Sequence, residues 1–143
     1  MKRLFISLML FITCYSLSAQ VRLDENRIVF EADNQSIALW NLSDSFFTPA
    51  IQEIEFVDNH LRDYFKKNAA ETANYDYSKY FRQYCGLIIN GQKIVFVNAA
   101  CSKEEKFTQV LLPYRGEGAC YFRTNVNLKD GKVIDFKFNE SKK

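Results

Sequence analysis

The stretch YFRQYCGLIINGQKIVFVNAAC, residues 80 to 101, decides the fold of this chain. Two apolar runs flank Asn90-Gly91, and an Asn-Gly pair between such runs is the strongest short-range signal for a β-hairpin. A two-residue turn sets Ile89 opposite Gln92. It also pairs Leu87 with Ile94 and Cys85 with Phe96. We therefore predict two long antiparallel strands in this register.

Both faces of this hairpin are apolar. One face carries Cys85 and Leu87, and the other carries Tyr84, Ile88, Val95 and Val97. Successive side chains on a strand point to opposite faces, so a strand that is apolar on both needs cover on both. We predict that the hairpin lies in the middle of a sheet, with a helix on one face. The N-terminal segment, a ligand or a second copy of the chain would cover the other face.

One helix is predicted just before the hairpin. Thr48-Pro49 supplies an N-cap hydroxyl followed by proline at the first helical position. Apolar residues then recur at spacings of three and four, as in a helix with one buried face, and Asn68 is a suitable stop. The members of that stripe are Ile51, Ile54, Val57, Leu61, Tyr64 and Phe65.

More strands are predicted on the C-terminal side. Residues 106–113 read as a third strand, and 120–138 as two further strands around Asp130-Gly131. A tight turn there would put the apolar residues of the two strands on opposite faces, because a one-residue slip flips every side chain. A glycine bulge repairs this by pairing Leu128 with Lys132 and Val126 with Ile134. In that register Phe122 faces Phe138.

These elements predict an α+β fold in which one long helix packs on a roughly five-stranded antiparallel meander sheet, as in cystatin-like proteins. Residues 20–47 form an N-terminal segment with short strands, which joins 48–143 in a single domain.

The first 19 residues have the pattern of a signal peptide. Lys2 and Arg3 precede an apolar run from Leu4 to Thr13, and small residues then lead to a cleavage site after Ala19. A lipoprotein signal with Cys14 as the acylated residue is the alternative. Cleavage removes two of the 19 basic side chains, and the basic side chains that remain then equal the 17 acidic ones in number. We therefore expect a secreted or periplasmic protein with no transmembrane segment after processing and no affinity for nucleic acid.

Three cysteines remain after processing. In the predicted hairpin Cys85 and Cys101 point to opposite faces, whereas Cys101 and Cys120 lie at adjoining strand ends. We predict a disulfide bond between Cys101 and Cys120. Cys85 is then a buried thiol, although as an alternative it could act as a nucleophile with His60, the only histidine.

Other site chemistry finds little support in the sequence. The chain has no CxxC pair and no paired histidines, so no metal site is predicted. It also lacks the glycine-rich patterns that cradle phosphates, and no cofactor is expected.

The segments YFRQYCGLIINGQKIVFVNAAC and GEGACYFRTNVNLKDGK, followed by a strand that ends in FNES, resemble small exported proteins of Bacteroidota. The resemblance covers roughly residues 45 to 140. That family has a signal peptide or lipid anchor and no known activity. It implies only structural roles for the matching positions Cys101, Gly118, Cys120 and Tyr121.

Together these patterns favour an exported, non-enzymatic protein that binds an unknown protein or small ligand, or a second copy of itself as a homodimer, through its sheet face. The expected binding residues are Tyr84, Tyr121, Arg123 and Asn125. Two alternatives remain open. One is a structural component of the cell envelope. The other is an enzyme with a small pocket lined by Arg82, Tyr84, His60 or Asp135.

Overall fold

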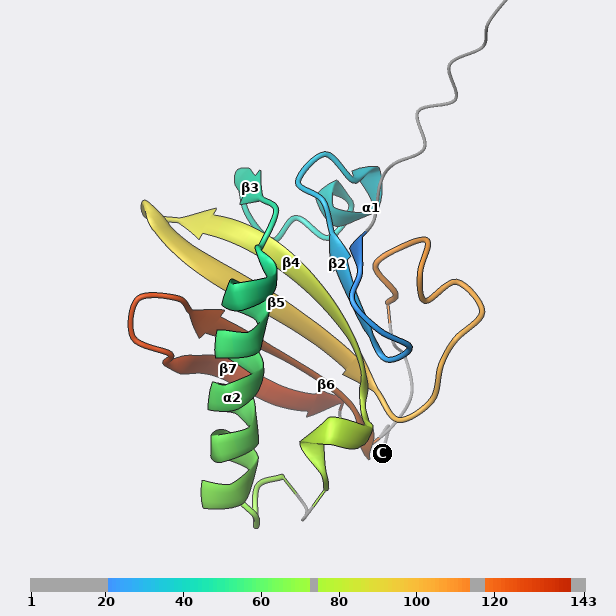
Figure 1. Cartoon of the computed structure of the whole chain (residues 1–143), viewed down its shortest axis with the longest axis vertical. Coiled ribbons are helices and arrows are strands. Elements are labelled where there is room, and N and C mark those ends of the chain that lie inside the picture. Colours follow the sequence, from blue (N-terminus) through green and yellow to red (C-terminus); the bar gives the residue numbers. More distant parts are fainter. Residues whose placement is uncertain (1–20, 73–74, 114–117, 140–143) are drawn as a thin grey trace, which may run out of the picture.

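A computed structural model describes residues 21–72, 75–113 and 118–139, which form one sheet with a long helix across it (Figure 1). The signal peptide and Cys14 lie outside these residues, so their assignment stays a prediction. The elements, in chain order, are β1 (Val21–Arg22), β2 (Arg27–Phe30), α1 (Gln35–Ala38), β3 (Ser45–Phe47), α2 (Ile51–Lys67), η1 (Tyr77–Lys79), β4 (Phe81–Ile89), β5 (Gln92–Ala100), β6 (Gly118–Asn127) and β7 (Val133–Asn139).

The predicted central hairpin is confirmed. β4 and β5 pair antiparallel from Ile89↔Gln92 through Cys85↔Phe96 to the far end of both strands. Asn90 and Gly91 both have positive φ, at 50° and 73°, as the hairpin turn that suits the twist of the strands requires. The hairpin lies inside the sheet, flanked by β2 and β3 on one side and by β6 on the other.

The sheet is larger than predicted, and only β4-β5-β6-β7 form the predicted antiparallel meander. The described residues contribute seven strands in the order β1-β2-β4-β5-β6-β7, with β3 also paired to β4. β2 runs parallel to the first half of β4, and β3 runs antiparallel to its second half. Gly86 lies opposite Phe47 on β3, and a side chain at Gly86 would collide with the backbone and ring of Phe47. The N-terminal segment therefore extends the sheet, and it also supplies the helical turn α1.

The segment 106–113 is not a strand, which corrects the prediction. β5 pairs directly with β6 along its length, so no strand edge is left for this segment. Its backbone instead bonds to side chains of the sheet. Gln83 Nε2 donates to the carbonyls of Phe107 and Val110 at 2.7 and 2.8 Å. Asn98 Nδ2 donates to the carbonyl of Leu112 at 2.8 Å.

The helix α2 begins two residues later than predicted. Its N-cap is Ala50, whose amide donates to Glu53 Oε2 at 2.8 Å. The hydroxyl of Thr48 accepts a bond from the amide of Ala32 and does not cap the helix. The predicted end is confirmed, since Asn68 is the C-cap residue.

The last hairpin keeps part of its predicted register. Phe122 pairs with Phe138 as expected, but Val126 pairs with Val133 and not with Ile134. One register shift lies between Gly118 and Phe122, and a second lies between Arg123 and Asn125, opposite a stretch where Asp135 has a φ of 54°. The bulge thus sits within the strands and not at the turn. It puts Val133 and Phe136 against the core under α2 and pairs Ile134 with Asn125 on the other face.

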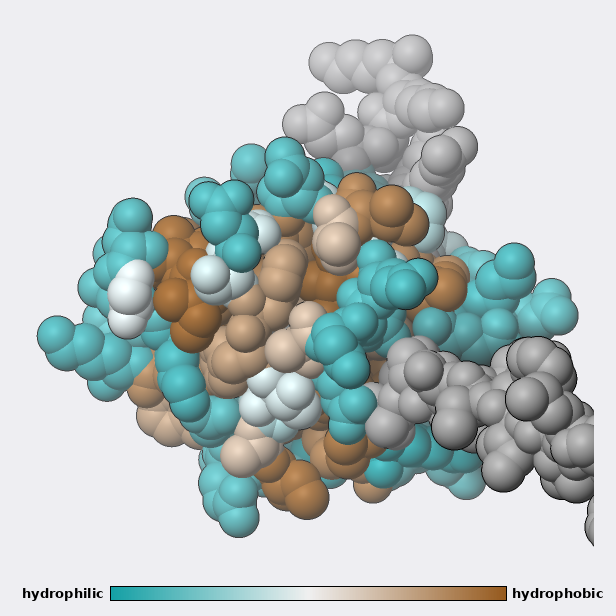
Figure 2. All heavy atoms as spheres, turned by 90° about the horizontal axis from the view of Figure 1, so that it is seen from above, coloured by the Kyte–Doolittle hydropathy of each residue, from teal (hydrophilic) through white to brown (hydrophobic). Residues whose placement is uncertain are grey.

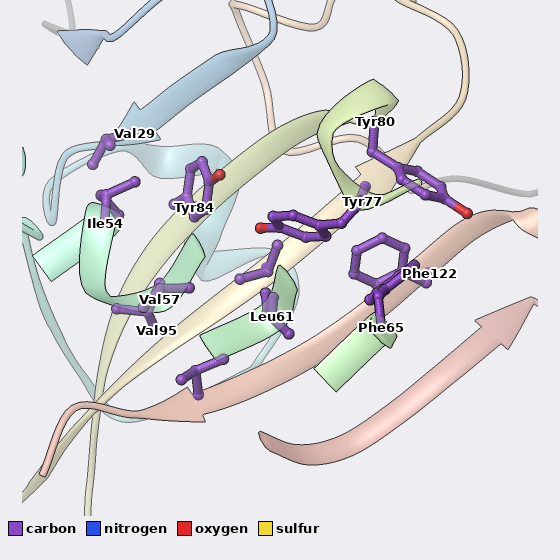
Figure 3. Close-up of a cluster of buried hydrophobic side chains, with 13 residues drawn as sticks. Val29, Ile54, Val57, Leu61, Phe65, Tyr77, Tyr80, Tyr84, Val95 and Phe122 are labelled. Carbon is purple, nitrogen blue, oxygen red and sulfur yellow. The ribbon is translucent and has the colours of Figure 1, made fainter. Parts of the chain in front are cut away.

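Two cores fill the two faces of the sheet. The first lies between α2 and the sheet, and its residues come from the helix, η1 and four strands (Figure 3). Aromatic rings dominate one end of it, where the Phe65 ring contacts those of Tyr77, Tyr80 and Phe122. The second core lies on the opposite face, under α1 and the 104–113 segment, and contains Ile28, Phe30, Ile37, Cys85, Leu87, Ile94, Phe96, Phe107 and Leu111.

Candidate functional site

A buried carboxylate joins α2 to the sheet. Asp58 is 0% exposed and accepts hydrogen bonds at 2.6 Å from the hydroxyls of both Tyr77 and Tyr84. Its other oxygen lies 3.0 Å from Nη1 of Arg27 and 3.5 Å from Nη1 of Arg82. One carboxylate therefore has four partners, from β2, η1 and β4.

This network is closed. Tyr84 is 0% exposed and Tyr77 2%, and burial is the main reason that the pKa values of both phenols are raised above their usual value. The neighbouring Asp58 carboxylate raises them further. A phenol that stays protonated remains a hydrogen-bond donor. The Asp58 network thus fixes the helix on the sheet and gives a substrate no room.

The thiol of Cys85 is equally inaccessible. Its side chain is 0% exposed, and burial raises its pKa well above the usual range for cysteine. A cysteine nucleophile needs the thiolate form, and a raised pKa suppresses it. Cys85 is therefore a core residue, as expected from the strand pattern.

His60 cannot reach Cys85. Tyr84, next to Cys85 on β4, belongs to the core under α2, so Cys85 points away from that helix. His60 is carried by α2, where Nδ1 lies 2.8 Å from the carbonyl of Phe56 and the ring packs over Gly131. The sheet separates the two side chains. A Cys85–His60 pair is thus incompatible with this fold.

The other two described cysteines are joined to each other. Cys101 and Cys120 form a disulfide bond, as predicted, and the Cys101 amide donates to the carbonyl of Cys120 at 2.8 Å. Of the three cysteines in the described part of the chain, none can act as a free surface nucleophile.

A hollow lined by described residues lies over the second core. It has a volume of about 510 Å³ and runs between α1 and the end of the 104–113 segment. We call it the Trp40 groove. It is lined by Ser36, Leu39, Trp40, Val110, Leu111, Pro113 and Arg123. Ligand sites in proteins are typically concave and mostly apolar, with a few polar groups, and this groove has that character.

The two walls of the Trp40 groove are tied together. Trp40 Nε1 donates to the carbonyl of Leu111 at 3.2 Å, and the Leu111 amide donates to Ser36 Oγ at 3.0 Å. Beneath, the Trp40 ring packs on Phe96 with ring centres 5.8 Å apart. The Ser36 hydroxyl donates to Asn34 Oδ1 at 2.7 Å. An amide oxygen is no base, so this hydroxyl is not activated as a nucleophile.

Leu39 stands on the open side of the groove with 86% of its surface exposed. Figure 2 views the molecule from above, onto the end where α1 and β3 lie in Figure 1, and shows apolar residues gathered between hydrophilic ones. Contiguous apolar patches on a protein surface mark sites that bind a partner or a ligand, whereas a single exposed apolar residue is ordinary.

A row of polar side chains leads across the sheet to the groove. Direct strand pairing places Gln83 beside Asn98, Asn98 beside Arg123, and Arg123 beside Lys137. Gln83 and Asn98 are buried and bind the 107–112 backbone, whereas Arg123 is exposed and lines the groove. The row thus ends in two neighbouring cations.

The structure places the residues that were expected to bind a partner on opposite faces of the sheet. Tyr121, Arg123 and Asn125 lie on the sheet face away from α2, as the strand alternation indicates, and Arg123 lines the Trp40 groove. Tyr84 is buried under α2, where a partner does not reach it.

The residues named for an enzyme pocket are likewise divided. Arg82 and Tyr84 meet at Asp58, while His60 packs against Phe56 and Gly131. Asp135 is exposed on the edge strand β7. Apart from Arg123, no residue of the Trp40 groove was predicted to bind a ligand, because the walls of the groove come from segments far apart in the chain.

Within the described residues, no cluster of three or more potential metal ligands is found. No described helix is long and apolar enough to cross a membrane.

Comparison with known proteins gives one family. Its model, that of the Tungro spherical virus-type peptidases, matches residues 4–108. This match contradicts the expectation of a non-enzymatic protein and favours the enzyme alternative. The matched span holds the whole Asp58 network and the α1 wall of the groove. No curated protein and no solved structure matches the chain. Because the match covers most of its length, the chain belongs to the family of Tungro spherical virus-type peptidases.

Proposed function

We propose that the protein is an enzyme that acts on polypeptides and that the Trp40 groove binds the substrate chain. The observation that carries this proposal is the groove itself, an apolar hollow of about 510 Å³ bordered by a cation. A peptide presents side chains of the size and polarity that such a hollow accepts. Membership of a peptidase family supplies the class of substrate.

The geometry also limits the chemistry. Cys85 is buried and separated by the sheet from His60, and Cys101 is held in a disulfide bond. A hydrolytic mechanism in this fold must therefore use a group other than a described thiol. The carboxylate of Asp58 is already saturated with donors, so we assign it to stability and not to the reaction.

Further expectations from the sequence accompany this proposal. We infer that the protein is exported, and the Cys101–Cys120 disulfide supports that inference because disulfides persist in oxidising compartments. The cystatin-like arrangement, the homodimer and the similarity to exported proteins of Bacteroidota stay predictions.

A cleavage assay tests the proposal. The purified protein, with its N-terminus and oxidation state first fixed by intact mass, is incubated with a mixed peptide library, and new termini are followed by mass spectrometry. We expect time-dependent cleavage. Leu39→Glu places a charge on the rim of the apolar groove at an exposed position, and we expect cleavage to fall at least about tenfold, the equivalent of 1.4 kcal/mol of binding.

Two control variants accompany the assay. Ile51→Glu adds the same charge at another exposed apolar position, 56% exposed and outside the groove, and should cleave like the unmodified protein. Cys85→Ser should also retain cleavage. A library left unchanged by the unmodified protein, or cleavage lost in Cys85→Ser while the fold is retained, would refute the proposal.

A further inference from the structure

The charge at the Trp40 groove is one-sided. Among the described residues that line the groove, Arg123 is the one with a charged side chain. Its direct neighbour on β7 is Lys137, and like charges on paired residues destabilise a sheet. Neither cation forms an ion pair with a carboxylate in the described part of the chain. As far as the described residues go, the groove is thus an apolar hollow with a positive border.

A ligand that fits this arrangement carries an apolar side chain and a negative charge only a few atoms apart. The C-terminal residue of a polypeptide, when it is large and apolar, has both. Its α-carboxylate can form paired bonds with the guanidinium of Arg123, the geometry that makes arginine a preferred partner of carboxylates. Its side chain can then pack between Leu39, Trp40 and Val110.

The Ser36 hydroxyl suits the same ligand. It donates one bond to Asn34 and accepts one from the Leu111 amide, and a hydroxyl oxygen can accept two. The remaining lone pair is available to the amide N–H of a bound peptide. The groove therefore offers an apolar wall for the side chain of a C-terminal residue, a cation for its α-carboxylate and a hydrogen-bond acceptor for its amide N–H.

We infer that the Trp40 groove recognises the C-terminal residue of a polypeptide, with its apolar side chain in the groove and its α-carboxylate on Arg123. This inference rests on the proposed function and narrows its substrate class to chains with a free, apolar C-terminus. A peptide that continues past this point has no charge to offer Arg123, and the loss of a charge-assisted bond disfavours it.

Trp40 is the only tryptophan in the chain, so its fluorescence reports directly on the groove. The probes are N-acetyl-Ala-Ala-Phe with a free carboxylate and the same tripeptide with a C-terminal amide. They are titrated into the full-length protein and read before turnover. We expect the acid to bind at least about tenfold more tightly than the amide, as one charge-assisted bond allows.

Variants assign that difference to Arg123. Arg123→Gln should bind the acid and the amide equally, and Arg123→Lys, which keeps the charge but loses the fork, should show an intermediate preference. Arg62→Gln is the matched control. Arg62 lies on α2, across the sheet from the groove, and its Nη1 donates to Asn59 Oδ1 at 2.8 Å. Its removal should leave the preference unchanged.

The outcomes separate this inference from the proposed function. Equal binding of acid and amide by the unmodified protein, or a preference that persists in Arg123→Gln, overturns the C-terminal assignment; the proposed function stands if cleavage still depends on Leu39. Cleavage without any response of Trp40 to either probe overturns the same assignment. Failure of both assays, with no cleavage and no response, overturns both proposals.

Discussion

Asp58 is buried, although an aspartate on an amphipathic helix is usually exposed to solvent. On a helix with acidic residues near its start, it would be expected on the solvated side. Instead it is buried, and it accepts bonds from two phenols and contacts two guanidiniums. Arg82, whose side chain is 6% exposed, has Nε and Nη1 without a hydrogen-bond partner among the described residues, so its charge depends on Asp58. The carboxylate is needed to balance buried positive charge.

Asp58→Asn tests that dependence. The substitution keeps the shape of the side chain but leaves Arg82 buried without a counter-charge, and breaking a buried ion pair in this way costs about 3–5 kcal/mol. We expect a loss of that size in the free energy of unfolding by urea. Asp63→Asn is the control, because it makes the same change at an exposed position of α2 and should be nearly neutral. A loss below about 1 kcal/mol for Asp58→Asn would contradict the role we give the carboxylate.

At the scale of elements, the 104–113 segment shows how side chains can replace a strand. The amide of Gln83 bonds to the carbonyls of Phe107 and Val110, and its Oε1 accepts from the Leu112 amide at 3.0 Å. Asn98 donates to the same Gln83 oxygen at 2.9 Å. These two buried amides hold the segment that forms one wall of the Trp40 groove.

Gln83→Met removes this anchor while it conserves most of the volume. The carbonyls and the amide that Gln83 binds lose their partner, and each buried polar group left unsatisfied costs about 1–3 kcal/mol. We expect a loss of about 2–4 kcal/mol in the free energy of unfolding and faster hydrogen exchange at the Leu112 amide. Gln52→Met, on the exposed face of α2, should change neither quantity. Unchanged exchange at Leu112 would show that the segment is held by its apolar contacts alone.

The same segment explains why some elements could be predicted and others could not. The Asn90-Gly91 hairpin, the helix stripe from Ile54 onward and the Cys101–Cys120 bridge follow from spacing along the chain, and they are confirmed. Ile51, predicted as the first member of the stripe, is instead 56% exposed in the first turn of α2. Residues 106–113 have the apolar content of a strand, but β6 occupies the edge of β5 that a following strand would have joined. Pairing over long range decided that result, and a local pattern carries no information about it.

The candidate site is non-local in the same way. Ser36 and the Leu111 amide that it binds are 75 residues apart, and Arg123 reaches the groove through the register of β6. Strand alternation did indicate that Tyr121, Arg123 and Asn125 share a face. It could not indicate that α1 and the 104–113 segment lie over that face, or that a hollow opens between them. Only Arg123 was named in advance among the residues of the groove.

For the molecule as a whole, the tyrosines of the α2 core make the free energy of unfolding depend on pH in the alkaline range. Burial is the main cause that raises the pKa of Tyr64 to about 12, and its bond to Glu71 adds to the effect. Burial raises the phenol pKa values of Tyr77, Tyr80 and Tyr84 still further. In the unfolded chain all four phenols ionise near the usual pKa of 10. Above that pH the unfolded chain binds fewer protons than the folded one, so stability falls as pH rises.

We therefore expect these four phenols to add no pH dependence to the free energy of unfolding below pH 10. From pH 10 upward the free energy of unfolding should decrease. Phenolate absorbance measured on the folded protein should show Tyr64 ionising at about 12, whereas Tyr77, Tyr80 and Tyr84 should ionise only when the chain unfolds. Tyr64→Phe should remove the absorbance step at about 12. The later ionisation of the other three phenols, which accompanies unfolding, should remain. If these four phenols instead titrated near 10 while circular dichroism reported an intact fold, the closed core between α2 and the sheet would be the wrong description of this molecule, because burial is the main cause that keeps their hydroxyls protonated.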